Sequence, residues 1–309
     1  MAFTAQDVKK LREMTNVGMM DCKKALQATD GDMDAAIDWL REKGLAKAAK
    51  KADRIAAEGV AYAAVIDGVG VVIEVNSETD FAAKTDSFLD LVKNLATVVA
   101  QQNPADVDAL KACTYPNSNL TVTEIMQEKV MSIGENMQIR RFVRLPENTS
   151  VSYVHAGGTH GVLVNLAVEG DIDVTELGKN VAMQIAAMNP RYWDKSQVPQ
   201  ADVDKEMQVQ LALMDNDPKM SGKPAAVKEK IAAGKMAAFY KESCLLQQEF
   251  VRGDLYKGDV AGYIADAAKK LGGKVTFVDA VHYIKGEGIE KKVDDFAAEV
   301  AAQVAGAGK

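Results

Sequence analysis

The sequence predicts an α+β protein made of four parts: an N-terminal module of three helices, a duplicated core with antiparallel sheets, a helical coiled-coil hairpin inserted in the second half of the core, and a C-terminal helical module. Three observations predict this: apolar residues at helical spacing near both ends, a strand–turn–strand pattern that occurs twice, and two apolar helical stripes joined by a polar turn. We expect the boundaries at residues 1–53, 54–145, 146–285 and 286–309, with the inserted hairpin at about 200–240.

The N-terminal module is expected to contain three short helices separated by turns, an arrangement similar to ubiquitin-associated (UBA) bundles. Thr4 can cap a first helix with apolar residues on one face, and a Gly-containing turn leads to a second helix at 19–29. Residues 30–32, Asp-Gly-Asp, can end the second helix and cap a third at 33–43. The stretch 45–57, rich in Ala and Lys, predicts a helical connector to the core.

Two similar segments in the middle of the chain indicate an internal duplication. Residues 62–75 match residues 153–166, since 153 − 62 = 91 and 166 − 75 = 91. In both, an aromatic residue begins a strand that continues through a Gly-containing turn into a second, apolar strand. Each segment is followed by an amphipathic helix and a later strand, at 137–145 and 275–284. The core is therefore expected to consist of two related α+β subdomains with helices packed on antiparallel sheets.

The second half of the core is longer because it carries an insertion. Residues 202–214 and 225–240 each show an apolar stripe at helical spacing, and the segment between them is rich in Asp, Asn, Gly, Lys and Pro. Two such stripes joined by a turn predict an antiparallel helical hairpin. Near the end of the chain, apolar residues at helical spacing predict a short helix at 294–304, followed by a disordered tail at 306–309.

Composition and charge exclude several classes of protein. The net charge of −7 argues against a dedicated nucleic-acid binder, whose phosphate contacts need a basic face. Three widely separated cysteines predict no disulfide framework. The chain shows no signal-peptide pattern and no apolar run long enough to span a membrane, so we expect a cytoplasmic protein without direct contact to nucleic acid or membrane.

No pattern of catalytic residues is present in the sequence. The three histidines stand outside any H-E-x-x-H motif, the cysteines lack the spacing of metal ligands, and G-x-S-x-G is absent. Residues 221–224, Ser-Gly-Lys-Pro, lack the upstream glycine of a phosphate-binding loop. We therefore expect no catalytic residue, no bound metal and no cofactor.

The segment 71–84 is the most informative part of the chain. A β-branched run at 71–75, typical of a strand covered on both faces, ends in the polar residues 76–80, and Phe81 follows directly. Helical residues are expected from about Ala82 onward, continuing past Thr85. Phe81 can pack back on its own helix as a hydrophobic staple, or it can be presented to a partner from a loop on a rigid scaffold.

Several motifs, in the same order along the chain, resemble those of the bacterial elongation factor Ts family. They are GMMDCKKAL at 18–26, EVNSETDF at 74–81, IGEN at 133–136, the arginine pair at 140–141 and GEGIE at 286–290. The resemblance covers nearly the whole length. It implies a guanine-nucleotide exchange factor for elongation factor Tu that performs no covalent chemistry, with the four-part organisation described above.

The resemblance also implies which residues carry the exchange. In this family the segment that follows the core strand is associated with displacing Mg²⁺ from elongation factor Tu, and the aromatic residue wedges between elements of the GTPase. Asp80 could instead serve to cap the following helix. Ala82 stands where the family often has valine. The residues of this segment are Thr79, Asp80, Phe81 and Ala82.

Further contacts with the partner are implied at three other places. Adjacent residues on a helix do not share a face, so at most one of the two neighbouring methionines is easily buried in the small module and the other is available. The loop at 156–158 departs from the family's pattern. The residues expected to contact elongation factor Tu are Met19, Met20, Ile133, Gly134 and His155.

A second function remains open from the residues alone, namely a scaffold that binds partners without catalysing exchange. The UBA-like module and the helical hairpin are both suited to docking. The scaffold would leave the lifetime of bound nucleotide unchanged, which separates the two functions. The family includes proteins that form homodimers and two-plus-two complexes with elongation factor Tu, and the sequence leaves this choice open.

Overall fold

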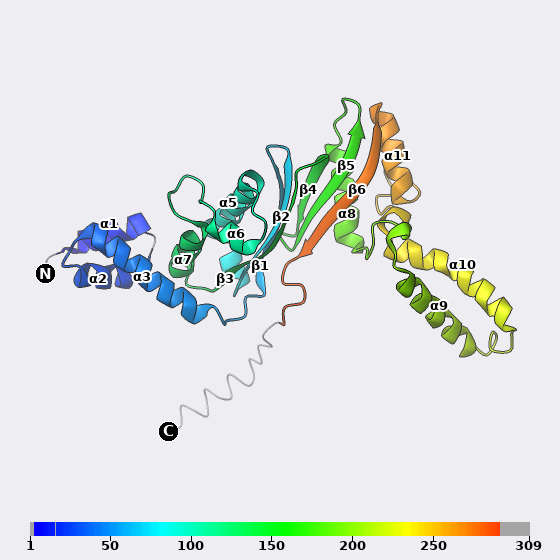
Figure 1. The fold of residues 1–309 in the computed structure, drawn as a ribbon, viewed down its shortest axis with the longest axis horizontal. Coiled ribbons are helices and arrows are strands. Elements are labelled where there is room, and N and C mark those ends of the chain that lie inside the picture. Colours follow the sequence, from blue (N-terminus) through cyan, green and yellow to red (C-terminus); the bar gives the residue numbers. More distant parts are fainter. Residues whose placement is uncertain (1–2, 16, 291–309) are drawn as a thin grey trace, which may run out of the picture.

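The N-terminal part of the molecule consists of three packed helices. The computed structural model describes residues 3–15 and 17–290, and its elements are shown in Figure 1. The expected connector is the second half of the third helix, which runs on to Lys51 and delivers the chain to the first sheet. Leu11, Cys22 and Leu26 form the centre of a small separate core. The three helices are α1 (Ala5–Thr15), α2 (Met19–Ala28) and α3 (Met33–Lys51).

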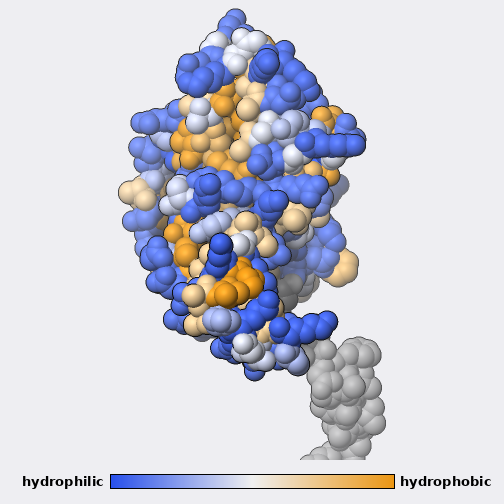
Figure 2. Space-filling view, turned by 90° about the vertical axis from the view of Figure 1, so that its right-hand side faces the viewer, coloured by the Kyte–Doolittle hydropathy of each residue, from blue (hydrophilic) through white to orange (hydrophobic). Residues whose placement is uncertain are grey.

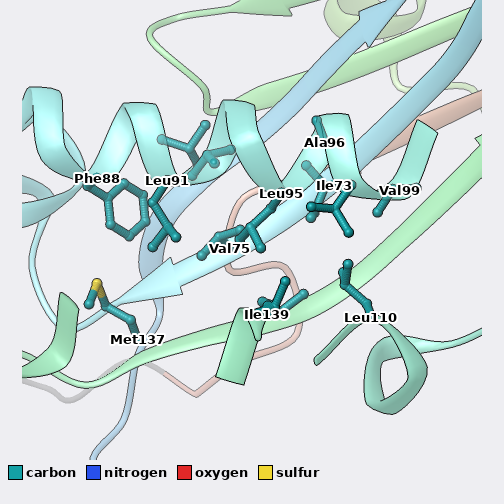
Figure 3. Packing of buried hydrophobic residues seen from close by; sticks show 14 of the residues in the cluster. Ile73, Val75, Phe88, Leu91, Leu95, Ala96, Val99, Leu110, Met137 and Ile139 are labelled. Carbon is teal, nitrogen blue, oxygen red and sulfur yellow. The ribbon is translucent and has the colours of Figure 1, made fainter. Parts of the chain in front are cut away.

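The first sheet has three antiparallel strands in the order β1-β2-β3. Asp67 and Gly68, both with positive φ (51° and 81°), make the two-residue turn between β1 and β2. The helix α5 lies across the outer face, where Phe88, Leu91 and Leu95 pack among the buried side chains of β2 and β3 (Figure 3). The elements are β1 (Glu58–Ile66), β2 (Val69–Ser77), β3 (Met137–Leu145), α4 (Asp80–Ala83), α5 (Asp86–Gln102), α6 (Val107–Ala112) and α7 (Val122–Ile133).

The second sheet repeats the plan of the first, with antiparallel strands in the order β4-β5-β6. Its β-bulge at Asn165/Leu166 corresponds to the bulge at Glu74/Val75 in the first sheet, because 165 − 74 = 91 and 166 − 75 = 91. A shared bulge at the spacing of the sequence match supports the predicted duplication. The elements are β4 (Thr149–His155), β5 (His160–Glu169), β6 (Lys274–Ile284), α8 (Thr175–Met188) and α11 (Val260–Leu271).

The inserted helices form a hairpin that projects away from the sheets, at the opposite end of the molecule from α1–α3 (Figure 1). Helix α9 (Gln200–Asp215) packs against α10 (Ala225–Ser243), as the two apolar stripes predict. Short 3₁₀ turns flank the hairpin at Lys195–Gln197 and Leu245–Gln247. Figure 2, which views this side of the molecule, shows apolar patches separated by a band of hydrophilic side chains.

The two sheets pack on each other through their inner faces, with helices on both outer faces. Small residues permit the close approach: a Cβ on Gly161 would lie 2.9 Å from the Ala61 carbonyl. Val72 and Leu163 meet in a small buried cluster between the sheets. The amide of Ala61 donates to the carbonyl of Gly158 (2.8 Å), which joins β1 to the turn between β4 and β5. The two halves therefore pack directly on each other around a thin inner layer.

The end of β6 leads back to the first sheet. Gly286 and Glu287 lie against β2 and β3, and the C-terminal helix predicted at 294–304 and the tail at 306–309 lie outside the described residues. Within the part of the chain that the structure describes, no helix has the length and apolar character needed to cross a membrane.

Candidate functional site

The polar tip after β2 presents an outward-facing aromatic ring. The side chain of Phe81 is 80% exposed, whereas its neighbours Ala82 and Ala83 are buried against the core. The interpretation of Phe81 as a hydrophobic staple that packs back on its own helix is therefore wrong. The two alanines occupy the inward positions of the α4 turn, so the ring is left on the outside.

The helix expected from Ala82 past Thr85 is in fact two helices. The Thr79 hydroxyl accepts from the Ala82 amide (3.2 Å) and caps α4, while the Thr85 hydroxyl accepts from the Phe88 amide (3.3 Å) and caps α5. Thr85 has an extended backbone, which ends the first helical segment after one turn. The break isolates α4 as a short projection that carries the ring.

Asp80 is the first residue of α4, and the capping role considered for it belongs to Thr79. Its carboxylate bonds to the Lys84 ammonium at 2.6 Å across one helical turn. This hydrogen bond is the main reason that the pKa of Asp80 lies below its ordinary value. Next to the exposed ring the protein therefore presents a carboxylate that is ionised at neutral pH.

The loop after α7 lies directly beside the tip. Gly134 ends the helix in the left-handed conformation (φ 89°), and Ile133 packs against the core of the first subdomain. The next two residues make the contact: the Thr79 amide donates to Glu135 Oε2 (3.0 Å), and the Asn136 amide donates to Glu78 Oε1 (2.6 Å). The structure thus brings together the residues predicted at 79–82 and at 133–134.

A broad groove of about 1240 Å³ runs beside the tip. It is lined by Asp80 and Phe81, by the segment that leads into β1, by Ala156 and Gly157 of the β4–β5 turn, and by Lys285. Lys285 pairs with Glu58 at 2.5 Å, which links the end of β6 to the start of β1. The groove therefore lies where both subdomains meet, and the ring stands at its border.

His155 ends β4 on the same turn that contributes to the groove. Its ring is exposed, and Nδ1 lies 2.8 Å from the Tyr153 hydroxyl. The following turn is held tightly, because Gly158 (φ 97°) leaves room for Val60 where a Cβ would lie 2.7 Å from that side chain. The altered loop at 156–158 is thus docked on β1 and presents His155 at the surface.

Met19 and Met20 are both exposed, by 50% and 64%, at the start of α2. Buried positions of this helix are taken by Cys22, Ala25 and Leu26, so neither methionine is needed for the small core. Neither methionine lines the groove. The two side chains form a separate apolar surface on the N-terminal helices.

One buried charged group was not identified as part of the site from the sequence. Glu74 is fully buried in β2, and its carboxylate accepts from Arg140 (3.0 Å), Arg141 (2.7 Å) and the Gly286 amide (2.8 Å). Burial alone would raise the pKa of Glu74, but these hydrogen bonds together with one from Asn76 outweigh it and lower the pKa. In the sequence, a carboxylate inside a β-branched run indicates a buried charge, and a buried charge requires buried partners.

The three histidines, which stand apart in the sequence, lie near one another on the second sheet. His160 Nδ1 and His282 Nε2 are 3.0 Å apart with stacked rings, and the ring of His155 lies 5.9 Å from that of His160. Burial, and then the neighbouring His160, lowers the pKa of His282 to about 4. Among residues 3–15 and 17–290, no three His, Cys, Asp or Glu side chains are arranged to hold a metal ion.

Comparison with known proteins finds one family over most of the chain. The profile described as "Elongation factor TS" matches residues 78–287. The chain is 45% identical to "Elongation factor Ts" of Paramagnetospirillum magneticum, with 97% of each chain covered. It is 43% identical to the protein of that name from Magnetococcus marinus, over 99% of this chain and 100% of the relative. The corresponding identity is 46% for Rhodopseudomonas palustris, with 97% of each chain covered.

Proposed function

The chain belongs to the elongation factor Ts family, and from this premise we propose that it releases GDP from elongation factor Tu by inserting the tip after β2 into the GTPase. Members of the family are translation elongation factors that act as exchange factors and not as enzymes. The observation that carries the proposal is the position of Phe81: a large ring, 80% exposed, on a one-turn helix that packs on the first sheet.

The physical basis of exchange is linkage between two ligands of the same GTPase. A factor that binds the nucleotide-free GTPase more tightly than the GDP-bound form must weaken GDP binding by the same factor. Burial of an exposed phenylalanine ring contributes about 1.5–3 kcal/mol. Phe81 can supply this free energy only in the complex, and it offsets the displacement of the elements that hold Mg²⁺ and phosphate.

Asp80 is suited to act on the ion and the phosphates beside the wedge. Its lowered pKa keeps the carboxylate negative at neutral pH, and its pairing with Lys84 holds it on the outer side of α4. GDP is held by phosphate contacts and by Mg²⁺. A fixed negative charge brought near that site opposes the return of the phosphates once the ion has left. We assign the displacement of Mg²⁺ to Thr79, Asp80, Phe81 and Ala82 acting together.

The remaining contacts are assigned to three further places. Ile133 and Gly134 support the tip from the C-terminal end of α7, and His155 offers its exposed imidazole from the end of β4. Met19 and Met20 offer a separate apolar surface on α2. Separate contacts let the factor hold the GTPase while the tip acts on its nucleotide site.

The test measures the lifetime of GDP on elongation factor Tu. Stopped-flow release of a fluorescent GDP is expected to accelerate with added protein and to saturate. A scaffold without exchange activity would bind the same complex, as shown by light scattering, and leave the release rate unchanged. That second result would overturn the proposal and favour the scaffold.

The organisation and assembly of the chain complete the proposal. We retain the division at 1–53, 54–145, 146–285 and 286–309, with the insert at about 200–240 as a coiled coil; the separate hydrophobic clusters of the N-terminal helices and of the two sheets support it. Family membership supports a cytoplasmic location. A homodimer or a two-plus-two complex with elongation factor Tu would use exposed apolar residues such as Leu213 and Leu271, and light scattering of the free chain and the complex distinguishes the states.

A further inference from the structure

The tip needs an anchor other than its own helix. Helix α4 has four residues, and a single turn is unstable by itself because nucleation costs more than one hydrogen bond returns. The ring of Phe81 is exposed, so its burial does not hold the turn in place. The buried side chains of Ala82 and Ala83 are small and fix the base of the turn. The first half of the turn therefore depends on polar contacts.

Ser77 Oγ donates to the Thr79 carbonyl at 2.9 Å, and one carboxylate supplies two further contacts. Glu135 accepts from the Thr79 amide at 3.0 Å and from the Thr79 hydroxyl at 2.6 Å, so both of its oxygens are used on a single residue. Because the hydroxyl proton is directed at Glu135, the hydroxyl oxygen is left to accept from the Ala82 amide at 3.2 Å. The chain of hydrogen bonds runs from Glu135 through Thr79 into the residue after the ring, and each bond polarises the next.

The anchor is reciprocal. Glu135 accepts a hydrogen bond from the backbone amide of Thr79, and Glu78 accepts one from the backbone amide of Asn136 at 2.6 Å. The partners in these two contacts are 56 and 58 positions apart, so they join two loops from different parts of the first subdomain. Hydrogen bonds to a charged acceptor are stronger than neutral ones. The paired loops therefore hold the tip in one orientation before any partner is bound.

We propose that Glu135 is a positioning residue for exchange: it fixes the Phe81 ring in the orientation that enters the GTPase, and so removes the cost of ordering the tip during the reaction. This inference rests on the proposed function. Glu135 touches neither nucleotide nor ion in this account and acts through Thr79 alone.

The first experiment compares Glu135→Gln with a matched charge change at Glu147→Gln, an exposed carboxylate in the β3–β4 turn. Release of fluorescent GDP is followed at increasing factor concentration. Gln keeps one acceptor oxygen and carries no charge, so the Thr79 amide and hydroxyl can no longer both donate to a carboxylate. We expect this weaker anchor to lower the maximal rate about tenfold and to change the half-saturating concentration less than about twofold. The Glu147 variant is expected to match the wild type. An unchanged maximal rate for Glu135→Gln would overturn the inference.

A double-mutant cycle separates this inference from the proposed function. If Glu135 acts through the ring, Glu135→Gln adds no further loss in a Phe81→Ala background. Losses that multiply would show an independent role for Glu135 and contradict positioning. If Phe81→Ala alone has no effect, the wedge itself fails; if it slows release while Glu135→Gln does not, only the positioning role fails.

A measurement on the free protein completes the test without any partner. Hydrogen exchange of the amides at 79–82 is expected to be about tenfold faster in Glu135→Gln, and unchanged in Glu147→Gln, because the cap opens more often. Thr79→Val should reproduce the fast exchange of Glu135→Gln, and Thr79→Ser should restore protection. Equal protection in all variants would show that Glu135 does not hold the tip.

Discussion

The side chain of Glu74 shows how one residue joins parts of the chain that lie far apart. It is buried in β2, yet it accepts from Arg140, Arg141 and the Gly286 amide, 212 positions away along the chain. Arg141 also lies 4.0 Å above the ring of Tyr283 in β6. This network fixes Gly286 and Glu287, which follow β6, to the first sheet.

Removal of this charge should destabilise the protein strongly. Glu74→Gln leaves two guanidinium groups facing a buried neutral amide, and breaking a buried pair of this kind costs about 3 kcal/mol. The free energy of unfolding, measured with urea, is expected to fall by that amount relative to wild type. Glu147→Gln, at an exposed position, serves as the control. A loss below about 1 kcal/mol would contradict the structural role of the network.

The histidine pair predicts a loss of stability in mild acid. His282 has a folded-state pKa of about 4 against an ordinary value of 6.5, owing to burial, to the neighbouring His160 and, in smaller part, to Arg141, with Glu287 acting in the opposite direction. The unfolded chain therefore takes up a proton between pH 6.5 and 4 that the folded chain does not, and stability falls across that window.

Between pH 7.5 and 5.0 we expect this effect to cost about 1 kcal/mol, since the ring is only partly buried and solvent screens it. Urea unfolding at the two pH values gives the difference, and His282→Gln should show a smaller one. The stability contributed by Glu74, whose pKa is lowered, is lost only as the pH falls through its folded-state value below 4.5. Equal pH dependence in wild type and His282→Gln would contradict this account.

At the level of elements, the sequence predicts the strands and helices whose position is determined by local residue pattern. Both hairpins and both third strands follow from β-branched runs between Gly-containing turns, and β3 spans 137–145 as predicted. Helices α7 and α11 were not predicted, although Thr121 and Asp259 cap them and a glycine ends each one. Both helices have apolar residues at helical spacing in the sequence, but the surface that each helix covers is determined by the tertiary fold.

The site was predicted in the same uneven way. Residues 79–82 and 133–134 were predicted through family motifs, and the structure places them side by side. The contacts that join them, from Glu135 and Glu78, could not be predicted because they depend on how α7 docks against the first sheet. Exposure of Phe81 also depends on packing, because only the burial of Ala82 and Ala83 decides which side of the turn faces out.

The close contact between the two sheets predicts how substitution of a glycine at their interface changes stability. A Cβ on Gly161 would lie 2.9 Å from the backbone of Ala61, which cannot move aside as a side chain can. Gly161→Ala is therefore expected to destabilise the protein by about 2 kcal/mol. Gly234, inside α10, has nothing within 4 Å of its Cβ position, so Gly234→Ala should stabilise by about 0.5–1 kcal/mol through helix propensity. Thermal denaturation of both variants tests the opposite signs, and shifts of the same sign would contradict the inner-layer packing.

For the whole molecule, the surfaces suited to binding a partner are separate from the tip that carries Phe81. The N-terminal helices with Met19 and Met20, the groove between the subdomains and the helical hairpin offer surfaces spread over the length of the chain (Figure 1). The tip occupies a small part of that surface and is fixed to the first subdomain by Thr79, Glu78 and their partners. A factor built in this way can hold a GTPase through many contacts while a single ring disturbs its nucleotide site.

The most direct test of the account is the maximal rate of GDP release with Phe81→Ala at saturating concentration. Loss of the ring removes about 1.5–3 kcal/mol of burial available only in the exchange complex. We predict a maximal rate about 10- to 100-fold slower than wild type, with an unchanged circular dichroism spectrum because the ring is exposed. A maximal rate equal to that of the wild type would show that the ring does not drive exchange.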